Sequence, residues 1–479
     1  MIRVLVIGAG TAGIPATLAA LDAGAEVVLV ERETRVGGVL WSSGGITSGA
    51  GTRIQRDKGI EDSPARHFAD VQRIGRGRAN VDILRRITDG AGATIDWFES
   101  IGARFTAESP TLAGFELYDT ARSYTLEADP ALGPWKGRVL ADLLQQALER
   151  RLLSPHLTLH LSSNLEELVR DESGRVSGAT VVTPGGRITI DADVVILSTG
   201  GYVAGQAVLR RLHPSFDRLI TQAPDFANGD GLVVAERAGA AIVNTDLVLP
   251  NPGGVEDPRK PGFRLEGGQL PIGRPPAEAG DIWVNRAGRR FFPEDAPNQA
   301  DRERAIAEQP DAVMFAVFDE PMRVQPGKVG EWTREKLGEP SDGGLIVSAR
   351  SIGELAQRML VPERALQETV EAYNRAVATG LDVLGRRSLP KAIDTPPFHS
   401  VLTRGVLIMT FAGVSANGEF EVLDLAGTPI PGLYAAGEVL GAGQLQGAGY
   451  SSGFMIVSSV TSGRLAALAA VRSVKAAKR

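Results

Sequence analysis

The chain has 479 residues, a formal net charge of −6 and 43% hydrophobic residues, and its length allows two or three domains with substantial cores. It contains no cysteine, which excludes disulfides, thiolate nucleophiles and Cys-ligated metals, and its negative charge argues against nucleic acid as a partner. Because the first apolar run begins at residue 2 and no apolar stretch reaches membrane-spanning length, we expect a cytoplasmic protein without a membrane span.

A glycine-rich turn near the start of the chain predicts a nucleotide site. An apolar run over residues 2–7 leads into Gly8-x-Gly10-x-x-Gly13, and a helix-like segment and a second apolar run follow, ending on Glu31. In this pattern the first glycine permits the turn, the second lets the backbone approach a pyrophosphate, and the third allows close helix–strand packing. The acid at the end of the second run can accept from a ribose hydroxyl. The pattern predicts a dinucleotide site without distinguishing FAD from NAD.

Helical and strand patterns then alternate. A loop of small residues spans 37–45, and apolar residues recur at helical spacing in 63–105 and 139–150. Short alternating runs with turn residues between them, from 157 to 190, predict a small antiparallel meander. A buried strand is expected at 194–197.

The pattern changes beyond residue 240. Residues 249–281 are rich in Pro and Gly and predict long loops, helices are expected at 351–360 and 362–378, and the order strand, glycine loop, helix returns from residue 433. The predicted domains are a nucleotide-binding domain in two parts, 1–240 and 401–479, and an inserted domain, 241–400.

Several motifs occur in an order that resembles one protein family. After the N-terminal fingerprint come Ser43-Gly44-Gly45, Ser198-Thr199-Gly200-Gly201, Asn228-Gly229-Asp230-Gly231, residues 284–291 with Glu294, and residues 431–439 (PGLYAAGEV). In this order they resemble the FAD-dependent flavoproteins that include soluble fumarate reductase, succinate dehydrogenase flavoprotein and 3-ketosteroid dehydrogenases. The resemblance implies an α/β fold: a Rossmann-like FAD-binding domain of the glutathione-reductase type, carrying the antiparallel meander, and an inserted α+β capping domain.

The resemblance selects FAD as the cofactor. Succinate dehydrogenase attaches its FAD to a His just before the flavin glycines, whereas no His precedes His67 here, so we expect non-covalent FAD. A second dinucleotide fingerprint is missing, which argues against bound NAD(P)H as reductant. The residues expected to bind FAD are Gly8, Gly10, Thr11, Ala12, Gly13, Glu31, Arg32, Gly38, Val39, Ser43, Gly44, Gly45, Thr199, Gly200, Gly201, Asn228, Asp230, Gly437, Glu438, Ser451 and Ser452.

The residues that fumarate-type enzymes use for their substrate are replaced. Those enzymes hold two carboxylates with His and Arg, but the positions of their paired histidines correspond to Leu407 and Ile408, and that of an Arg to Tyr450. A second Arg, expected soon after the acid matching Glu294, arrives only at Arg302. Apolar side chains and a phenol do not neutralise a dicarboxylate, so we expect neither fumarate nor succinate.

A ketone suits these replacements better. In 3-ketosteroid dehydrogenases a Tyr near the Tyr450 position and a following glycine N–H hold the ketone oxygen, and Tyr450 with Gly453 resembles that pair. Polarising the carbonyl acidifies its α C–H, a base removes the α proton, and a hydride leaves the β carbon for flavin N5. The resemblance thus implies Tyr450 and Gly453 as catalytic residues.

Two tyrosines are candidates for the base. Tyr118 and Tyr124 flank Arg122, and a nearby cation favours deprotonation of a phenol; packing in a loop is their alternative role. The base Tyr that ketosteroid dehydrogenases carry in their capping domain has no match, since only Tyr373 lies in the inserted domain, on a helix we expect to be structural. A smaller cyclic ketone is therefore as acceptable as a steroid.

Three functions follow as hypotheses. The first is an FAD-dependent dehydrogenase that introduces a C=C bond α,β to a ketone and passes electrons to an external acceptor. The second is a C=C reductase of the fumarate-reductase type acting on an enone or unsaturated acid, and the third a non-catalytic flavoprotein electron-transfer subunit. We expect no metal, and we read His67, His156, His160 and His213 as surface or capping residues. The oligomeric state stays open.

Overall fold

The computed structural model describes residues 1–479 except 113–116, 217, 270–279, 297–298, 325–334, 336, 342–343 and 479. The chain packs into two compact units: unit 1 comprises Met1–Leu212, Ala223–Val248 and Met409–Arg479, and unit 2 comprises His213–Gln222 and Leu249–Ile408. These boundaries differ from the predicted inserted domain, 241–400. Residues 213–222 lie in unit 2 because strand β10 (Ile220–Thr221) pairs with β17 (Phe398–Leu407). The local sequence pattern does not predict a pairing between segments so far apart in the chain.

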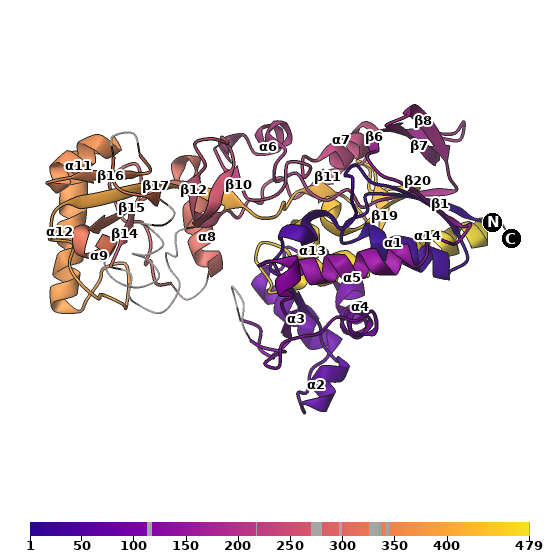
Figure 1. Ribbon diagram of the computed structural model, residues 1–479, viewed down its shortest axis with the longest axis horizontal. Coiled ribbons are helices and arrows are strands. Elements are labelled where there is room, and N and C mark those ends of the chain that lie inside the picture. The colour runs from indigo at the N-terminus through magenta and orange to yellow at the C-terminus, as the bar shows by residue number, and fades with distance from the viewer. Residues whose placement is uncertain are drawn as a thin grey trace. The chain divides into compact units, whose positions relative to one another are not determined.

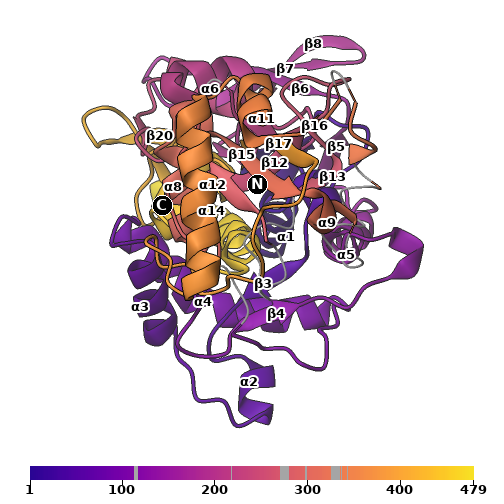
Figure 2. The ribbon, with the colours of Figure 1, turned by 90° about the vertical axis from the view of Figure 1, so that its left-hand side faces the viewer.

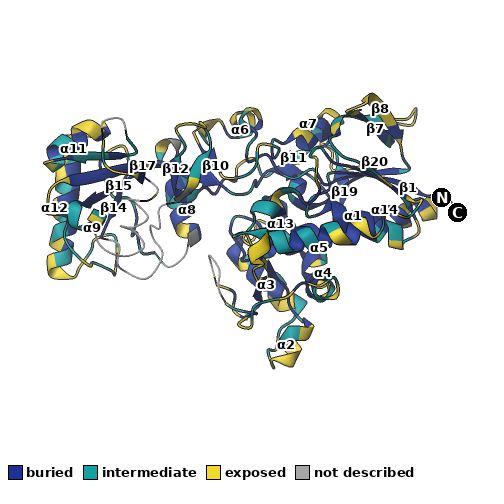
Figure 3. Ribbon diagram, in the orientation of Figure 1, coloured by how far each residue is buried: buried dark blue, intermediate teal, exposed yellow. Residues whose placement is uncertain are grey.

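A six-stranded sheet forms the centre of unit 1. Its strands are β1 (Arg3–Ile7), β2 (Glu26–Val30), β5 (Leu157–His160), β9 (Val194–Leu197), β19 (Glu421–Leu423) and β20 (Pro429–Ala435). They are ordered β19-β20-β9-β1-β2-β5, and all pairs are parallel except β19 with β20. Parallel sheets are covered on both faces, which explains the uninterrupted apolar runs of the central strands (Figure 3).

Two long helices cover this sheet. Helix α1 (Gly13–Asp22) packs against α14 (Phe454–Ala477), and both termini of the chain lie beside them (Figure 1). Helix α14 is long and apolar enough to cross a membrane by length and composition, which corrects the sequence expectation. Most of its apolar stretch is buried within unit 1, so we interpret it as a core helix.

Smaller elements complete unit 1. The predicted meander is present, but it consists of β6 (Asn164–Arg170), β7 (Val176–Thr183) and β8 (Gly186–Asp191), whereas β5, predicted as its first strand, joins the main sheet beside β2. Strand β3 (Ile46–Ser48), which follows the loop of small residues, pairs antiparallel with β4 (Ser123–Thr125). The remaining elements include α2 (Arg53–Asp57), α3 (Pro64–Ile74), α4 (Val81–Ser100), α5 (Gly137–Glu149), α6 (Gln206–Leu212), α7 (Asp230–Arg237) and α13 (Ala442–Gln446).

Unit 2 is built on a mainly antiparallel sheet centred on β17, with β10 as its one parallel partner among the described residues. The other strands are β12 (Asn251–Glu256), β13 (Arg264–Gln269), β14 (Ile282–Val284), β15 (Val313–Asp319) and β16 (Ile346–Ala349). Helices α11 (Ile352–Met359) and α12 (Glu363–Thr379) lie side by side against this sheet (Figure 2) and bury Leu355, Leu366 and Tyr373 in its core. Residues 249–281 were predicted to be loops, yet β12 and β13 form there; residues 270–279 of that prediction lie outside the described residues.

Candidate functional site

A cleft opens at the carboxyl ends of β1, β2 and β9 in unit 1, with about 920 Å³ of empty space when the part open to solvent is included. This is the edge at which parallel α/β sheets bind ligands. Fifteen of the predicted cofactor residues line it: Gly8, Gly10, Thr11, Ala12, Glu31, Arg32, Gly38, Val39, Thr199, Gly200, Gly201, Asn228, Asp230, Gly437 and Glu438. Sequence reasoning missed Ser163, Asn164, Leu165, Phe226 and Ala227, which also line the cleft. They carry no motif, and only the path of the chain brings them to this edge.

The structure accounts for two of the three glycines of the N-terminal turn. Gly8 has φ +99°, which permits the turn, and a Cβ on Gly13 would lie 1.7 Å from the Gly8 carbonyl oxygen, so Gly13 is required by helix–strand packing. Among the described residues, a Cβ on Gly10 would have only the Gly38 Cα, at 3.9 Å, as a neighbour. The protein itself leaves space at Gly10, and that space lies inside the cleft. This fits a bulky phosphate that approaches the backbone there.

Glu31 fixes the turn around the cleft. Its carboxylate accepts hydrogen bonds from the backbone N–H of Ala9 at 2.7 Å and of Glu33 at 2.9 Å. Burial raises the pKa of Glu31, and these backbone donors oppose the shift. Each carboxylate oxygen has further acceptor capacity, so Glu31 can also accept from a ribose hydroxyl.

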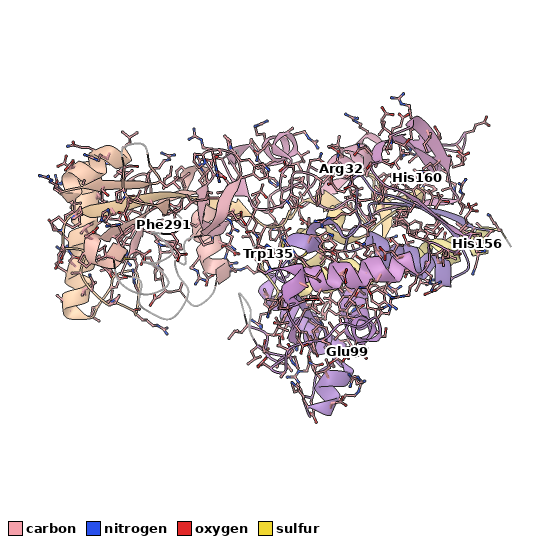
Figure 4. The ribbon with its side chains drawn as sticks, viewed as in Figure 1. Arg32, Glu99, Trp135, His156, His160 and Phe291 are labelled. Carbon is pink, nitrogen blue, oxygen red and sulfur yellow. The ribbon has the colours of Figure 1, made fainter. Side chains whose placement is uncertain are left out.

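Arg32 connects the end of β2 to the loop before α7 (Figure 4). Its guanidinium donates to Asp230 at 2.7 Å and to the Phe226 carbonyl at 2.9 Å. Asp230, predicted from the N-G-D-G motif, therefore holds the wall of the cleft as well as lining it.

The lining of the cleft also carries the carboxylate of Glu438 and the hydroxyl of Thr199. Glu438 accepts from the backbone N–H of Thr410 at 2.8 Å and from its hydroxyl at 3.1 Å, and burial raises the pKa of Glu438. The hydroxyl of Thr199 is buried and has no hydrogen-bond partner among the described residues. A buried polar atom without a partner destabilises the free protein, and a hydroxyl-rich ligand in the cleft would supply one.

The other predicted cofactor residues lie outside the cleft lining. A Cβ on Gly45 would lie 2.6 Å from the backbone nitrogen of Gly137, so Gly45 lets the small-residue loop pack on α5. Gly44, in contrast, has nothing within 4 Å of its Cβ position. Ser43 accepts the backbone N–H of Gly137 through its carbonyl, whereas Ser451 and Ser452 are buried in the Tyr450 loop, residues 447–453.

The Tyr450 loop contains the predicted ketone-binding pair. Tyr450 is 2% exposed, and its ring meets the edge of Phe411 with ring centroids 6.0 Å apart. Gly453 has φ +69° and packs so closely on β3 that a Cβ would lie 2.4 Å from the carbonyl carbon of Thr47. Only glycine combines this positive φ with so close a contact, and the contact holds the loop against β3.

The structure separates the three residues predicted around the base. The Tyr118 hydroxyl donates to the Ser452 carbonyl at 2.8 Å and so belongs with the Tyr450 loop. The Tyr124 hydroxyl is instead 2.5 Å from that of Thr52, the N-cap of α2. Arg122 is fully buried in an ion cluster with Asp62, at 2.9 Å, and Asp70, at 2.8 Å.

This arrangement corrects the expected acidity of the two tyrosines. Burial raises the pKa of both phenols above the ordinary value, and the charge of Arg122 opposes the shift for Tyr118 without overcoming it. Asp62 and Asp70 neutralise the charge of Arg122 by forming ion pairs with it. Tyr118 is a hydrogen-bond donor to the Ser452 carbonyl, Tyr124 shares a hydrogen bond with the Thr52 hydroxyl, and neither has the lowered pKa that a base requires.

Sequence reasoning placed one histidine wrongly, because His67 is neither a surface nor a capping residue. His67 is fully buried, with its ring edge-on to Tyr118 and Phe454, and burial followed by the Arg122 charge lowers its pKa well below the ordinary value. His213 is also buried. His156 and His160 lie just before and within β5 and are at least partly exposed (Figure 4). No metal-ligating group occurs among the described residues.

Glu294, the acid of the V-N-x-x-G motif, is a structural anchor of unit 2. It accepts from Arg290 at 2.6 Å and from the backbone N–H of Trp283 at 3.0 Å, and Arg386 lies 3.3 Å away. Asp382 accepts from Arg290 at 2.6 Å, so that two nearly fully buried arginines face two nearly fully buried carboxylates and compensate one another.

The sheet order, the glycine turn and the polar groups that line the cleft define a dinucleotide-binding α/β protein. Residues 3–453 match the family model described as an FAD binding domain, and the chain belongs to this family of fumarate reductase and succinate dehydrogenase flavoproteins. It is an FAD-dependent oxidoreductase that acts on CH–CH groups.

Known proteins of two kinds are similar to it. The chain is 28% identical over 469 residues to a fumarate reductase (cytochrome) of Shewanella frigidimarina, covering 97% of this chain and 76% of the relative. It is 28% identical over 444 residues to a urocanate reductase of Eggerthella lenta, covering 92% and 70%. The structure of a 3-ketosteroid-Δ4-(5α)-dehydrogenase from Rhodococcus jostii matches with TM-score 0.72 at 25% identity, covering 98% of this chain and 97% of that one.

Proposed function

We propose that the protein dehydrogenates a ketone at its α,β carbons, with a cyclic ketone as the substrate class. The observation that carries this proposal is the Tyr450 loop, which offers a phenol and a backbone N–H at the position where fumarate-type enzymes have an Arg. Behind the loop lies Arg122, but its charge is compensated by Asp62 and Asp70. Such a site suits a neutral carbonyl better than a dicarboxylate.

The residues of the loop act on the ketone oxygen. The Tyr450 hydroxyl and the Gly453 N–H bind this oxygen and stabilise the negative charge that it acquires when a general base other than Tyr118 and Tyr124 takes the α proton. The residues of the cleft would hold FAD, which would supply the acceptor for the hydride of the β carbon.

Covalent attachment of FAD in succinate dehydrogenase uses a His that precedes the flavin glycines. The first histidine of this chain, His67, follows them and is packed between Tyr118 and Phe454. We therefore propose that FAD is held non-covalently. Acid precipitation should then release all of it.

A second candidate runs the same chemistry in reverse. The fumarate and urocanate reductases among the relatives favour reduction of a C=C bond, here in an enone or unsaturated acid, by an external donor. The ketosteroid dehydrogenase of similar fold, solved with 4-androstene-3,17-dione, favours the first candidate.

Anaerobic mixing tests both candidates. Oxidised holoenzyme is mixed with cyclohexanones, a 3-ketosteroid and succinate, and reduced holoenzyme with the matching enones and fumarate, while flavin absorbance is followed. We expect bleaching by a cyclic ketone and none by succinate, and a Tyr450→Phe variant that reacts about 100- to 1000-fold more slowly. Reoxidation by an enone without any bleaching by ketones would favour the reductase. An unchanged Tyr450→Phe rate would refute activation of a carbonyl by Tyr450. No reaction with any ketone, enone or unsaturated acid would leave the non-catalytic electron-transfer subunit as the better hypothesis.

A further inference from the structure

The peptide unit between Ser452 and Gly453 has a hydrogen-bond donor on one side. Its carbonyl accepts the Tyr118 hydroxyl at 2.8 Å. Its N–H, on Gly453, has no hydrogen-bond acceptor among the described residues. In a trans peptide the C=O and N–H point in opposite directions, so the Gly453 N–H points away from Tyr118.

We propose that Tyr118 is a positioning residue, which orients and polarises the Ser452–Gly453 peptide so that the Gly453 N–H becomes a strong donor to the substrate oxygen. The inference rests on the proposed function, in which that N–H holds a ketone oxygen. A hydrogen bond accepted by a peptide carbonyl draws electron density away from its nitrogen and strengthens the N–H as a donor.

The surroundings of Tyr118 suit this role. Its ring is held between the Arg122 guanidinium, 5.2 Å from the ring centroid, and the edge of His67, with centroids 5.7 Å apart. Its hydroxyl has the Ser48 hydroxyl at 3.4 Å as a further neighbour. The phenol stays protonated because burial raises its pKa, and a protonated phenol can donate.

The rest of the loop is fixed at two more points. The Ser451 N–H donates to the side chain of Gln446 at 3.0 Å, and Gly453 is seated on Thr47. With these points fixed, the Tyr118 hydrogen bond decides the tilt of one peptide plane. The donor is thus set before substrate binds, which is the condition for strong oxyanion stabilisation.

The experiment uses para-substituted phenols as oxyanion probes, bound to the oxidised holoenzyme and followed by flavin absorbance. We expect Tyr118→Phe to weaken phenolate binding about 3- to 10-fold and to flatten the dependence of affinity on phenol acidity. 3-Fluorotyrosine at position 118, a stronger donor, should tighten binding. The control is Tyr434→Phe, which removes another buried hydroxyl of unit 1, bonded to Glu421 at 3.4 Å, and should change nothing.

The outcomes separate the inference from the function on which it rests. If Tyr450→Phe abolishes phenolate binding while Tyr118→Phe binds like the wild type, the positioning role is wrong and the proposed function stands. If wild type and Tyr450→Phe are equally poor binders, the proposed ketone site itself is wrong. If Tyr118→Phe loses its FAD, the test is made with the 3-fluorotyrosine protein instead. Unchanged phenolate affinity in that protein overturns the inference.

Discussion

Replacement of Gly10 by alanine should separate cofactor binding from folding. The structure leaves space for the new methyl group, since its nearest neighbour would be the Gly38 Cα at 3.9 Å, an ordinary van der Waals distance. The apoprotein should therefore unfold within about 1 kcal/mol of the wild type, because Gly→Ala at an unstrained position also reduces the entropy of the unfolded chain.

The cost should appear when FAD binds. The methyl group lies in the cleft where the pyrophosphate approaches the backbone, and overpacking by one methyl costs about 1–3 kcal/mol. This free energy corresponds to a Kd for FAD raised by about 5- to 150-fold. Apoprotein stability is measured by urea unfolding, and Kd by quenching of FAD fluorescence.

Two further glycines make the comparison decisive. Gly13→Ala would place its Cβ 1.7 Å from the Gly8 carbonyl oxygen, and main chain cannot move aside, so we expect this variant to fail to fold. Gly185→Ala, in the β7–β8 hairpin, has only the Thr183 hydroxyl at 3.6 Å and should bind FAD like the wild type. Wild-type FAD affinity in Gly10→Ala would refute the position assigned to the pyrophosphate.

The buried charges give three further predictions. His67→Phe keeps the ring packing but removes a group whose folded-state pKa lies well below 6.5. The stability that neutral His67 provides is present above pH 6.5 and is lost as the pH falls. The free energy of unfolding of the variant should therefore rise by about 1.4 kcal/mol relative to that of the wild type between pH 7.5 and pH 5.5. A difference that does not depend on pH in urea unfolding would contradict this. Burial raises the pKa of Asp281 from 3.8 to about 6, so its contribution is present at low pH and is lost as pH rises towards 6. Relative to Asp281→Asn, the wild type should lose about 3 kcal/mol between pH 3 and pH 7, and a difference of opposite slope would overturn the assignment. Arg122→Met leaves Asp62 buried without its counter-ion and Asp70 with only the half-exposed Arg73, 2.9 Å away, and should cost about 3–5 kcal/mol in unfolding free energy; partial recovery in the double variant with Asp62→Asn would confirm the cause.

Several features of the fold follow from local pattern. The glycine turn was predictable because the steric requirement for glycine arises within a few residues, as the contact of Gly13 with the Gly8 carbonyl oxygen shows. Strands β1, β2 and β9 were predictable because a parallel sheet buries both faces and leaves uninterrupted apolar runs. Strand β5 was assigned to the wrong sheet, because an alternating run of four residues does not show which neighbour it will pair with.

The sequence by itself determined that this is an FAD flavoprotein, since turn chemistry and ordered motifs are local properties of the chain. Only the tertiary structure decided what surrounds the predicted catalytic tyrosines. Tyr118 and Tyr124 are close in sequence, yet one reaches Ser452 and the other Thr52, and the cation between them is taken up by two aspartates. The reason is physical: hydrogen bonding and burial depend on partners brought from distant parts of the chain, and those partners decide whether a tyrosine is a base or a donor.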